Sequence, residues 1–414
     1  MNIINDTLFL EDISVETLMQ EYGSPLYVYE ESVLRSQFRQ LSSGFPEGLL
    51  EIHYSMKANS NPSLLKILRE EGSSIDAVSE FEVRLALESG FEPHQIIFTG
   101  NNNSLAEIEY CVEQEVSVNL GSLVLLEKFG QRFPQTSVSV RINPGIGAGH
   151  HKHCITGGPD SKFGIYHDQI DVALALATKY NLTLNGVHSH IGTGIYSAEP
   201  MLEAMEMILA VAEKFPDLEF IDFGGGFGIP YRPEQQALDM KDLSQKMTRR
   251  FTEFRQCYGR EISMKIEPGK LLVGPAGILL TTVTNITDTP KHRFVGVDSG
   301  FNHLLRPTLY GSYHKILNAS RYSGDEEDVV VVGYICESGD IFSRSGDKIE
   351  RKLPSPVIGE RLAFLDAGAY GFSMSSQYNS RPRPAEVLVH QGQSRLIRRA
   401  ETFEDLAQFF VDFN

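Results

Sequence analysis

A strand and the turn that ends it are encoded in the run His53-Tyr54-Ser55-Met56-Lys57-Ala58-Asn59-Ser60-Asn61-Pro62. The residues before Lys57 alternate as in a β-strand, and the Asn-Pro step stops the strand just beyond it. Lys57 is therefore predicted at the carboxyl end of a strand. Most lysines at such places are simply solvated. A partly desolvated one loses some preference for its charged form, and its amine can then attack an aldehyde.

The order of strand and then helix repeats outward from this run, between about residue 30 and residue 270. Predicted strands cover 51–57, 74–79, 95–100, 117–122, 137–143, 184–191, 220–224 and 263–267. Helical patterns lie between them at 63–70, 79–89, 104–114, 168–180, 198–214 and 240–256, and one more precedes them at 31–42. Repeats of this kind favour a closed parallel barrel over an open doubly wound sheet. We predict a (β/α)8 TIM-like barrel, an α/β fold, over residues 30–275.

Polar residues stand at the end of every predicted strand. One such residue indicates only that the chain reaches the surface, but barrel enzymes assemble their chemistry from the carboxyl ends of several strands. The set comprises Lys57, Asp76, Asn101, Asn119, Arg141 with Asn143, His188 with His190, Gly224–Gly226 and Glu267.

The helical repeat stops near residue 275. Strand patterns follow at 278–284, 294–297, 329–335, 361–366 and 386–389, with turns rich in Gly, Asp and Ser between them. The segment Leu26-Tyr27-Val28-Tyr29 is also strand-like. We predict a second, mostly β domain that comprises residues 1–29 and 276–414 and completes the active site.

Composition limits the functions that are open to the chain. Its 414 residues contain 54 acidic and 37 basic side chains, for a net charge of −17, which argues against nucleic acid or an anionic membrane as a partner. The cysteines at 111, 154, 257 and 336 have no CxxC spacing. No run approaches bilayer length, and the first twelve residues lack a signal-peptide pattern. We expect a cytoplasmic protein without a disulfide framework.

Two glycine-rich turns follow late barrel strands. Gly224, Gly225 and Gly226 could turn backbone amides toward a phosphate, or form an ordinary tight turn. Their spacing does not match the dinucleotide-binding pattern. Glu267 precedes Pro268-Gly269, so its carboxylate could pair with a protonated ring nitrogen, or the segment could be a surface turn.

Histidines suggest a metal only weakly. His188 and His190 share a predicted strand face, but no carboxylate or cysteine spacing accompanies them, and a flat imidazole could instead stack on a planar cofactor. His150, His151, His153 and Cys154 lie in a glycine-rich loop. We predict no metal site.

Pyridoxal phosphate (PLP) unites these features, because it needs an amine for its aldehyde, an acid for its ring nitrogen, a flat partner for its ring and amides for its phosphate. Beyond the barrel, Cys336 closes a strand-like segment, where a thiol could donate a proton or be purely structural.

The chain also resembles the alanine-racemase-like (fold-type III) PLP enzymes and, within them, the diaminopimelate decarboxylase family. The resemblance covers nearly the whole length. Its motifs, in order, are Tyr54–Asn59, Gly147–His151, Ser161–Gly164, His188–Gly192, Gly224–Gly228, Glu267–Gly269, Cys336–Asp340 and Asp366–Tyr370.

The resemblance implies a role for each candidate residue. Lys57 would bind the cofactor aldehyde, and Cys336 would donate a proton. The other implied cofactor residues are Asp76, His190, Gly224, Gly225, Gly226, Glu267, Gly269 and Tyr370. The implied substrate residues are Lys270, Arg306, Tyr310, Glu337 and Tyr370. The resemblance also implies a homodimer in which Cys336 and Glu337 complete the partner's pocket.

The implied reaction is decarboxylation of meso-2,6-diaminopimelate to L-lysine. Family members often have arginine after Glu-Pro-Gly, whereas this chain has Lys270, which keeps the charge but lacks the bidentate fork. A related decarboxylase for D-ornithine, D-lysine or a carrier-bound glutamate therefore remains an alternative. An inactive PLP-binding regulator is a further one, although this chain retains the lysine, the acid and the thiol.

Overall fold

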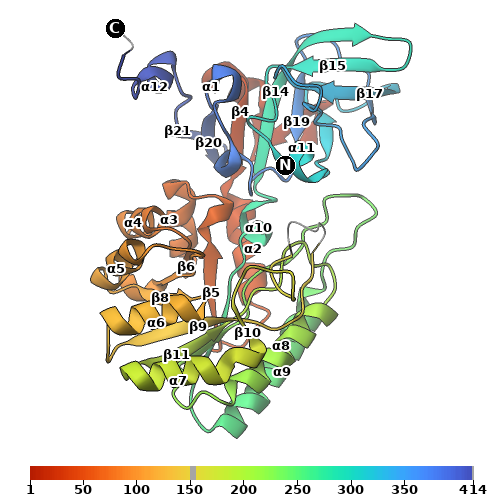
Figure 1. Ribbon diagram of the computed structural model, residues 1–414. Coiled ribbons are helices and arrows are strands. Elements are labelled where there is room, and N and C mark those ends of the chain that lie inside the picture. Colours follow the sequence, from red (N-terminus) through yellow and green to blue (C-terminus); the bar gives the residue numbers. More distant parts are fainter. Residues whose placement is uncertain (150–154, 413–414) are drawn as a thin grey trace. The chain divides into compact units, whose positions relative to one another are not determined.

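The computed structural model describes residues 1–149 and 155–412 (Figure 1). Two compact units divide the chain: one comprises residues 1–34, 230–235 and 273–414, and the other comprises residues 35–229 and 236–272. The domain boundaries proposed from the sequence, at 29/30 and 275/276, remain a prediction.

The unit of residues 35–229 and 236–272 contains a closed parallel barrel. Its strands are β5 (Leu50–Ser55), β6 (Ser74–Ala77), β7 (Ile96–Phe98), β8 (Ser117–Leu120), β9 (Ser137–Asn143), β11 (Thr183–His188), β12 (Phe220–Asp222) and β13 (Ser263–Ile266). Neighbouring strands run parallel, and the pairings β13–β5 and β8–β9 close the ring. The short strand β10 (Ile165–Tyr166) extends the edge of β9. The predicted barrel is confirmed.

Helices cover the outside of these strands (Figure 1). They are α2 (Glu31–Ser42), α3 (Pro62–Glu70), α4 (Glu80–Glu88), α5 (Leu105–Glu113), α6 (Leu123–Arg132), α7 (Ile170–Tyr180), α8 (Glu199–Ala212) and α9 (Met240–Tyr258). Asn61, Ser79, Ser104 and Ser122 cap four of them by accepting a first-turn amide. Each cap sets the residue at which the helix begins and therefore where the preceding loop ends. The sequence analysis did not name α6.

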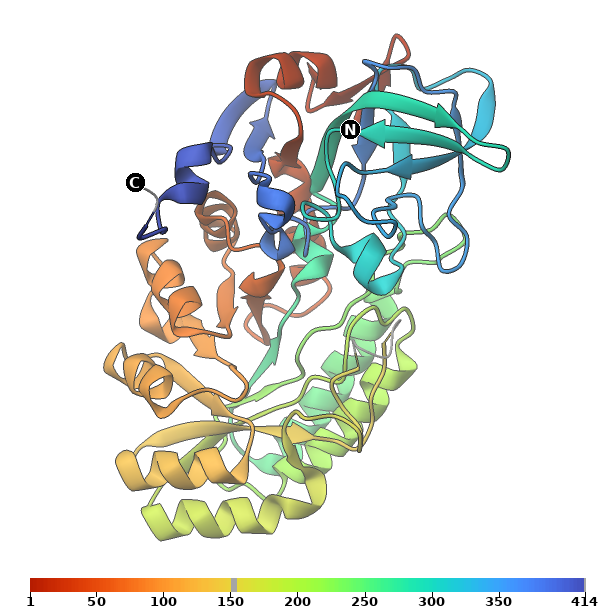
Figure 2. The same cartoon turned by 45° about the horizontal axis from the view of Figure 1, so that its top comes forward.

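The other unit is mostly sheet. Its strands include β4 (Leu26–Glu30), β14 (Gly277–Asp288), β15 (Arg293–Val297), β16 (Ile316–Asn318), β17 (Glu326–Val332), β18 (Arg351–Pro354), β19 (Arg361–Phe364), β20 (Ala385–His390) and β21 (Gln393–Arg398). The N-terminal strand β4 lies between β14 and the C-terminal strand β20, where red and blue ribbons meet in Figure 2. The predicted β domain, with its added N-terminal strand, is confirmed.

A hydrophobic core underlies this sheet. It contains Leu8 and Leu10 from the hairpin of β1 (Asn2–Ile4), β2 (Thr7–Leu10) and β3 (Ile13–Ser14), Leu18 from α1 (Val15–Tyr22), and Val387 from β20. The helices α11 (Arg306–Tyr310) and α12 (Phe403–Ala407) are short. Over residues 1–149 and 155–412, every helix is too short or too polar to cross a membrane.

Candidate active site

Lys57 lies in η1 (Met56–Ala58), a single turn of 3-10 helix directly after β5. Its Nζ donates a hydrogen bond to Oδ2 of Asp76, at the end of β6, over 2.9 Å. Burial raises the pKa of Asp76, but the charge of Lys57 and hydrogen bonds from Thr99 and Ser55 outweigh burial and lower the pKa to about 2. Lys57 is 37% exposed and thus partly desolvated, and the carboxylate of Asp76 is an anionic partner that the sequence did not indicate.

The turn after β12 fits only glycine. Gly224 and Gly226 have φ of +67° and +103°, which side-chain-bearing residues rarely adopt. A Cβ on Gly225 would overlap the carbonyl oxygen of Glu267. The Gly225 N–H donates to Nδ1 of His190 over 3.0 Å. This turn therefore lies against both the end of β13 and the imidazole that was predicted to stack on a planar ring.

His190 is a neutral, flat group. Burial lowers its pKa well below the usual range, and the charges of Arg141 and Lys57 lower it further. The bond from Gly225 agrees with this state, because Nδ1 accepts it as an unprotonated nitrogen. A neutral imidazole can stack on an aromatic ring without bringing a charge to it.

Glu267 is buried at the end of β13 and is held by His188. The Oε2 of Glu267 lies 3.1 Å from Nε2 of His188, at the end of β11. Oε1 of Glu267 is also buried and has no hydrogen-bond partner among the described residues. A buried carboxylate oxygen without a donor is costly, so a ligand that brings an N–H to Oε1 would remove the penalty.

Asp222, at the end of β12, completes a buried trio that the sequence analysis missed. One atom each from His188, Asp222 and Glu267 lies within 4.8 Å of the others. Burial raises the pKa of Asp222 well above its usual range, and the charge of Glu267 raises it further. A trio of this kind has the ligand types that a metal ion can bind, although the raised pKa disfavours the charged form of Asp222. The available signal was that Asp222 and Glu267 end the two strands that follow β11.

A cavity of about 360 Å³ joins these side chains. Lys57, His190 and Glu267 line it, together with the cations Arg141 and Lys162 and the ring of Phe163. This volume lies in the range of small-molecule sites. The cavity therefore offers an amine (Lys57), a carboxylate oxygen without a donor (Glu267), a neutral flat ring (His190) and positive charge. This combination suits a planar, anionic aldehyde with a basic ring nitrogen. These residues fit PLP.

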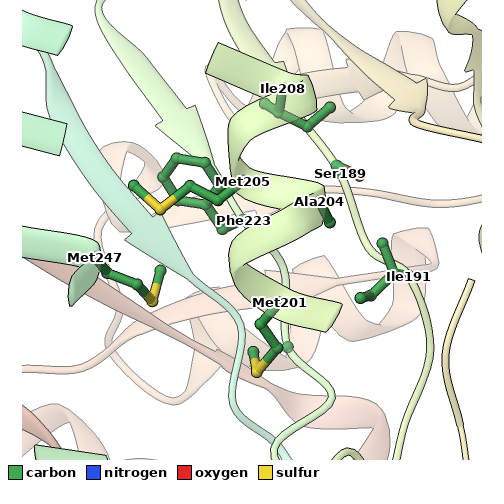
Figure 3. A pocket seen from close by; sticks show the side chains of 9 residues that line it. Ser189, Ile191, Met201, Ala204, Met205, Ile208, Phe223 and Met247 are labelled. Atoms are coloured by element: carbon green, nitrogen blue, oxygen red, sulfur yellow. The ribbon is translucent and has the colours of Figure 1, made fainter. Parts of the chain in front are cut away.

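A second, apolar cavity lies beside α8 and is far smaller, at about 10 Å³ (Figure 3). Met201, Met205 and Met247 border it, together with Ser189 and with Gly225 of the turn described above. Space of this size holds at most about one water molecule. Flexible methionine side chains commonly fill such gaps, so we regard it as a packing feature.

Gly269 and Lys270 follow Glu267 directly. A Cβ on Gly269 would lie 3.1 Å from the Cβ atoms of Ser55 and Ala58, so glycine allows close approach to the Lys57 turn. Lys270 is buried and begins α10 (Lys270–Val273). It is not among the described residues that line the 360 Å³ cavity.

The remaining predicted site residues belong to the β-rich unit. Arg306 is buried at the start of α11, and Tyr310, half-buried, ends that helix. Tyr370 is also half-buried and has φ of +56°. Cys336 and Glu337 are exposed. The cluster His150, His151, His153 and Cys154 lies outside the described residues.

A partner of Glu337 was missed by sequence reasoning. The hydroxyl of Tyr378 donates to Oε1 of Glu337 over 2.6 Å, and Oδ1 of Asn379 accepts the N–H of Cys336 over 3.0 Å. Both partners belong to the 3-10 turn η6 (Tyr378–Ser380). The only signal in the sequence was a tyrosine and an asparagine in a Ser- and Pro-rich stretch.

The barrel and its cavity define a PLP-dependent decarboxylase. Residues 31–274 match the family described as "Pyridoxal-dependent decarboxylase, pyridoxal binding domain". The whole chain belongs to the diaminopimelate decarboxylase family.

Relatives of that name resemble the chain over nearly their full length. The diaminopimelate decarboxylase of Methanothermobacter thermautotrophicus is 44% identical, with 94% of this chain and 92% of that protein covered. The one from Escherichia coli K12 is 37% identical, with 95% and 96% covered. The solved Helicobacter pylori enzyme, complexed with L-lysine, has a TM-score of 0.87 at 33% identity, with 95% and 98% covered.

Proposed function

We propose that this protein decarboxylates meso-2,6-diaminopimelate to L-lysine and carbon dioxide, the last step of lysine biosynthesis. The observation that supports this most is similarity to diaminopimelate decarboxylases over 94% and 95% of the chain. Two of the similar solved enzymes of that name, from Helicobacter pylori and M. jannaschii, are complexed with L-lysine, the proposed product.

In this proposal the barrel unit holds the cofactor. Lys57 provides the amine for the aldehyde, and Asp76 keeps that amine in place. Glu267 would accept the ring N–H with its free oxygen, and His190 would stack on the ring. The glycine turn at Gly224–Gly226 and the close approach at Gly269 would leave room for the phosphate. Bound PLP supplies an electron sink for the bond to the departing carboxylate.

The β-rich unit supplies substrate and proton contacts. Arg306 binds the distal carboxylate and Glu337 the distal ammonium, because a zwitterionic end needs one group of each sign. Tyr310, Tyr370 and Lys270 are further substrate contacts, and Tyr370 also approaches the cofactor. The thiol of Cys336 gives its proton to the carbon that has lost carbon dioxide.

We propose a homodimer with shared active sites. Cys336, Glu337 and Ser338 are all exposed in the single chain, although two of them are assigned to chemistry that excludes water. A partner subunit that covers this segment would bury them. The proposed location is the cytoplasm, on the basis of the scattered cysteines.

The rival candidate is a sister decarboxylase acting on D-ornithine, D-lysine or a carrier-bound glutamate, which the lysine at position 270 keeps open. Solved lysine/ornithine decarboxylases from Vibrio vulnificus share the fold at 21% identity. The buried guanidinium of Arg306 favours the dicarboxylate, because ornithine and lysine bring no second carboxylate to it. An inactive regulator is a weaker candidate, because Lys57, Glu267 and Cys336 are all present.

The test is carbon dioxide release by PLP-loaded protein from a panel of meso-diaminopimelate, D-ornithine, D-lysine, L-ornithine, L-arginine and a glutamate derivative. We expect kcat/KM to be highest for diaminopimelate by about 100-fold or more, from the extra charged contact. Faster turnover of any other member would refute the proposed substrate. A yellow protein that releases no carbon dioxide from any of them would indicate the inactive regulator.

A further inference from the structure

Arg306 is a buried cation without an acid beside it. Its side chain is 2% exposed. In residues 1–149 and 155–412, no carboxylate oxygen lies within 4.0 Å of its guanidinium. Asp366 is near enough for the charge of Arg306 to act on it, but burial dominates and raises the pKa of Asp366 to about 6. A buried charge is costly unless it is paired. A ligand that brings an anionic group to Arg306 would therefore offset this cost.

His314 fixes one edge of this guanidinium. Its Nε2 lies 2.8 Å from Nη1 of Arg306, and its Nδ1 lies 2.9 Å from the carbonyl oxygen of Leu365. Guanidinium nitrogens only donate hydrogen bonds, and carbonyl oxygens only accept them. Nε2 must therefore carry the lone pair and Nδ1 the proton. The contacts thus select the neutral ring with a single tautomer.

Tyr231 fixes the face of the guanidinium. The Cζ of Arg306 lies 4.6 Å from the centre of the Tyr231 ring, and that ring meets the His314 ring edge-on at 5.3 Å. All of these residues belong to the same unit. Among the described residues, His314 provides the only hydrogen bond to the Arg306 side chain. The remaining donors of the guanidinium can bind a carboxylate as a fork.

We infer that His314 is a positioning residue that aims Arg306 at the distal carboxylate of the substrate. The inference rests on the proposed function and deepens it. It names His314 as the residue that orients Arg306, through which the enzyme would select a dicarboxylate. Without the acceptor at Nε2, the guanidinium could turn about its stem while remaining charged and buried. The paired N–H donors of Arg306 would then approach the carboxylate in the wrong plane.

Two substitutions separate the two hydrogen bonds of His314. In His314→Gln the amide oxygen falls near the place of Nε2, so the acceptor for Arg306 is kept. In His314→Asn the amide nitrogen falls near the place of Nδ1, so only the donor to Leu365 is kept. The two variants are matched in chemistry and differ in which partner they retain.

The experiment measures steady-state kinetics of the PLP-loaded full-length chain with meso-diaminopimelate. We expect His314→Asn to raise KM about tenfold, since a misaligned fork loses roughly one charge-assisted hydrogen bond. In His314→Gln we expect KM within about threefold of wild type, which is the scatter of a near-neutral substitution. The visible absorbance of the cofactor and kcat should stay near wild type in both variants.

A second readout excludes a general structural effect. Cadaverine has two amines and no carboxylate, so its inhibition constant should be the same in wild type and in His314→Asn. If His314→Asn does not fold, His314→Met replaces it, because methionine fills the space of the ring without a nitrogen acceptor. The same rise in KM and the same unchanged inhibition by cadaverine are expected.

The inference is overturned if His314→Asn leaves KM unchanged, if both variants bind substrate equally weakly, or if inhibition by cadaverine weakens in parallel. The wild-type assay distinguishes failure of the inference about His314 from failure of the proposed function. A wild-type chain that releases no carbon dioxide from diaminopimelate would refute both. If the wild type is active and His314→Asn has the same KM as the wild type, only the role of His314 is refuted.

Discussion

The Nε2 of His188 lies 3.1 Å from Oε2 of Glu267, and both side chains are buried at the ends of barrel strands. His188 thus occupies one oxygen of the carboxylate and leaves the other for a ligand. This division orients Glu267 before any cofactor arrives. A carboxylate held in one plane can keep a ring nitrogen protonated, which an amide cannot do.

Glu267→Gln is expected to lower kcat by about 100-fold or more, the usual loss when one preorganised electrostatic contact is removed. PLP should still bind through Lys57, so the protein stays yellow. Carbon dioxide release and the absorbance spectrum of the loaded variant check both parts. A kcat within about threefold of wild type would mean that Glu267 does not serve the ring nitrogen.

The ion pair of Asp76 with Lys57 predicts a pH-dependent stability. The pKa of Asp76 falls from 3.8 to about 2 on folding, so its contribution is fully present above about pH 4 and is lost as the pH falls through 2. That shift corresponds to about 2 kcal/mol. In cofactor-free protein, the free energy of unfolding of wild type should exceed that of Asp76→Asn at pH 6, and the difference should shrink between pH 4 and pH 2.

Urea unfolding of the two proteins at matched pH measures this difference. Other carboxylates, such as Glu51, also have a lowered pKa, but they are common to both proteins and cancel in the comparison. A difference that stays constant down to pH 2 would show that Asp76 is not a paired anion in the folded chain.

Tyr378→Phe removes the hydroxyl that donates to Glu337 and keeps the ring stacked on Phe301, at 5.7 Å between centroids. We expect KM for diaminopimelate to rise about fivefold, as the loss of one hydrogen bond implies, because Glu337 loses its fixed orientation. The control is Tyr22→Phe, which removes a part-buried hydroxyl in α1 that is hydrogen-bonded to Ser394 of β21. Equal KM values for the two variants would contradict a role for Tyr378.

Cys336→Ala should lower kcat by about 100-fold or more while PLP binding is unchanged, since a positioned general acid contributes at least that much. Cys257→Ala is the matched control, because Cys257 is also an exposed free thiol but lies in α9. If both variants keep the wild-type kcat, another group supplies the proton.

Local sequence signals located the parts of the site that depend on one strand end. Lys57 follows β5 directly, and the Gly224–Gly226 turn follows β12, as their runs predicted. Contacts across the barrel were not predictable in this way. The pairing of His188 with Glu267 spans 79 residues and depends on the register of β11, β12 and β13.

The β-rich unit shows the same limit. Arg306 and Glu337 were found through their motifs, but their partners His314 and Tyr378 were not. No periodicity connects Glu337 to Tyr378, because 41 residues separate them and an irregular turn brings them together. Periodic patterns predict helices and strands, whereas contacts between loops depend on the folded chain.

The most direct measurement identifies the lysine whose amine binds the cofactor covalently. PLP-loaded wild type is reduced with borohydride, digested and mapped by mass spectrometry, with Lys57→Ala treated in the same way. Lys57 should carry the added mass in the wild type, and the variant should lose it. Added mass on Lys162, which lines the same cavity, or on Lys270 would contradict the assignment on which the whole account depends.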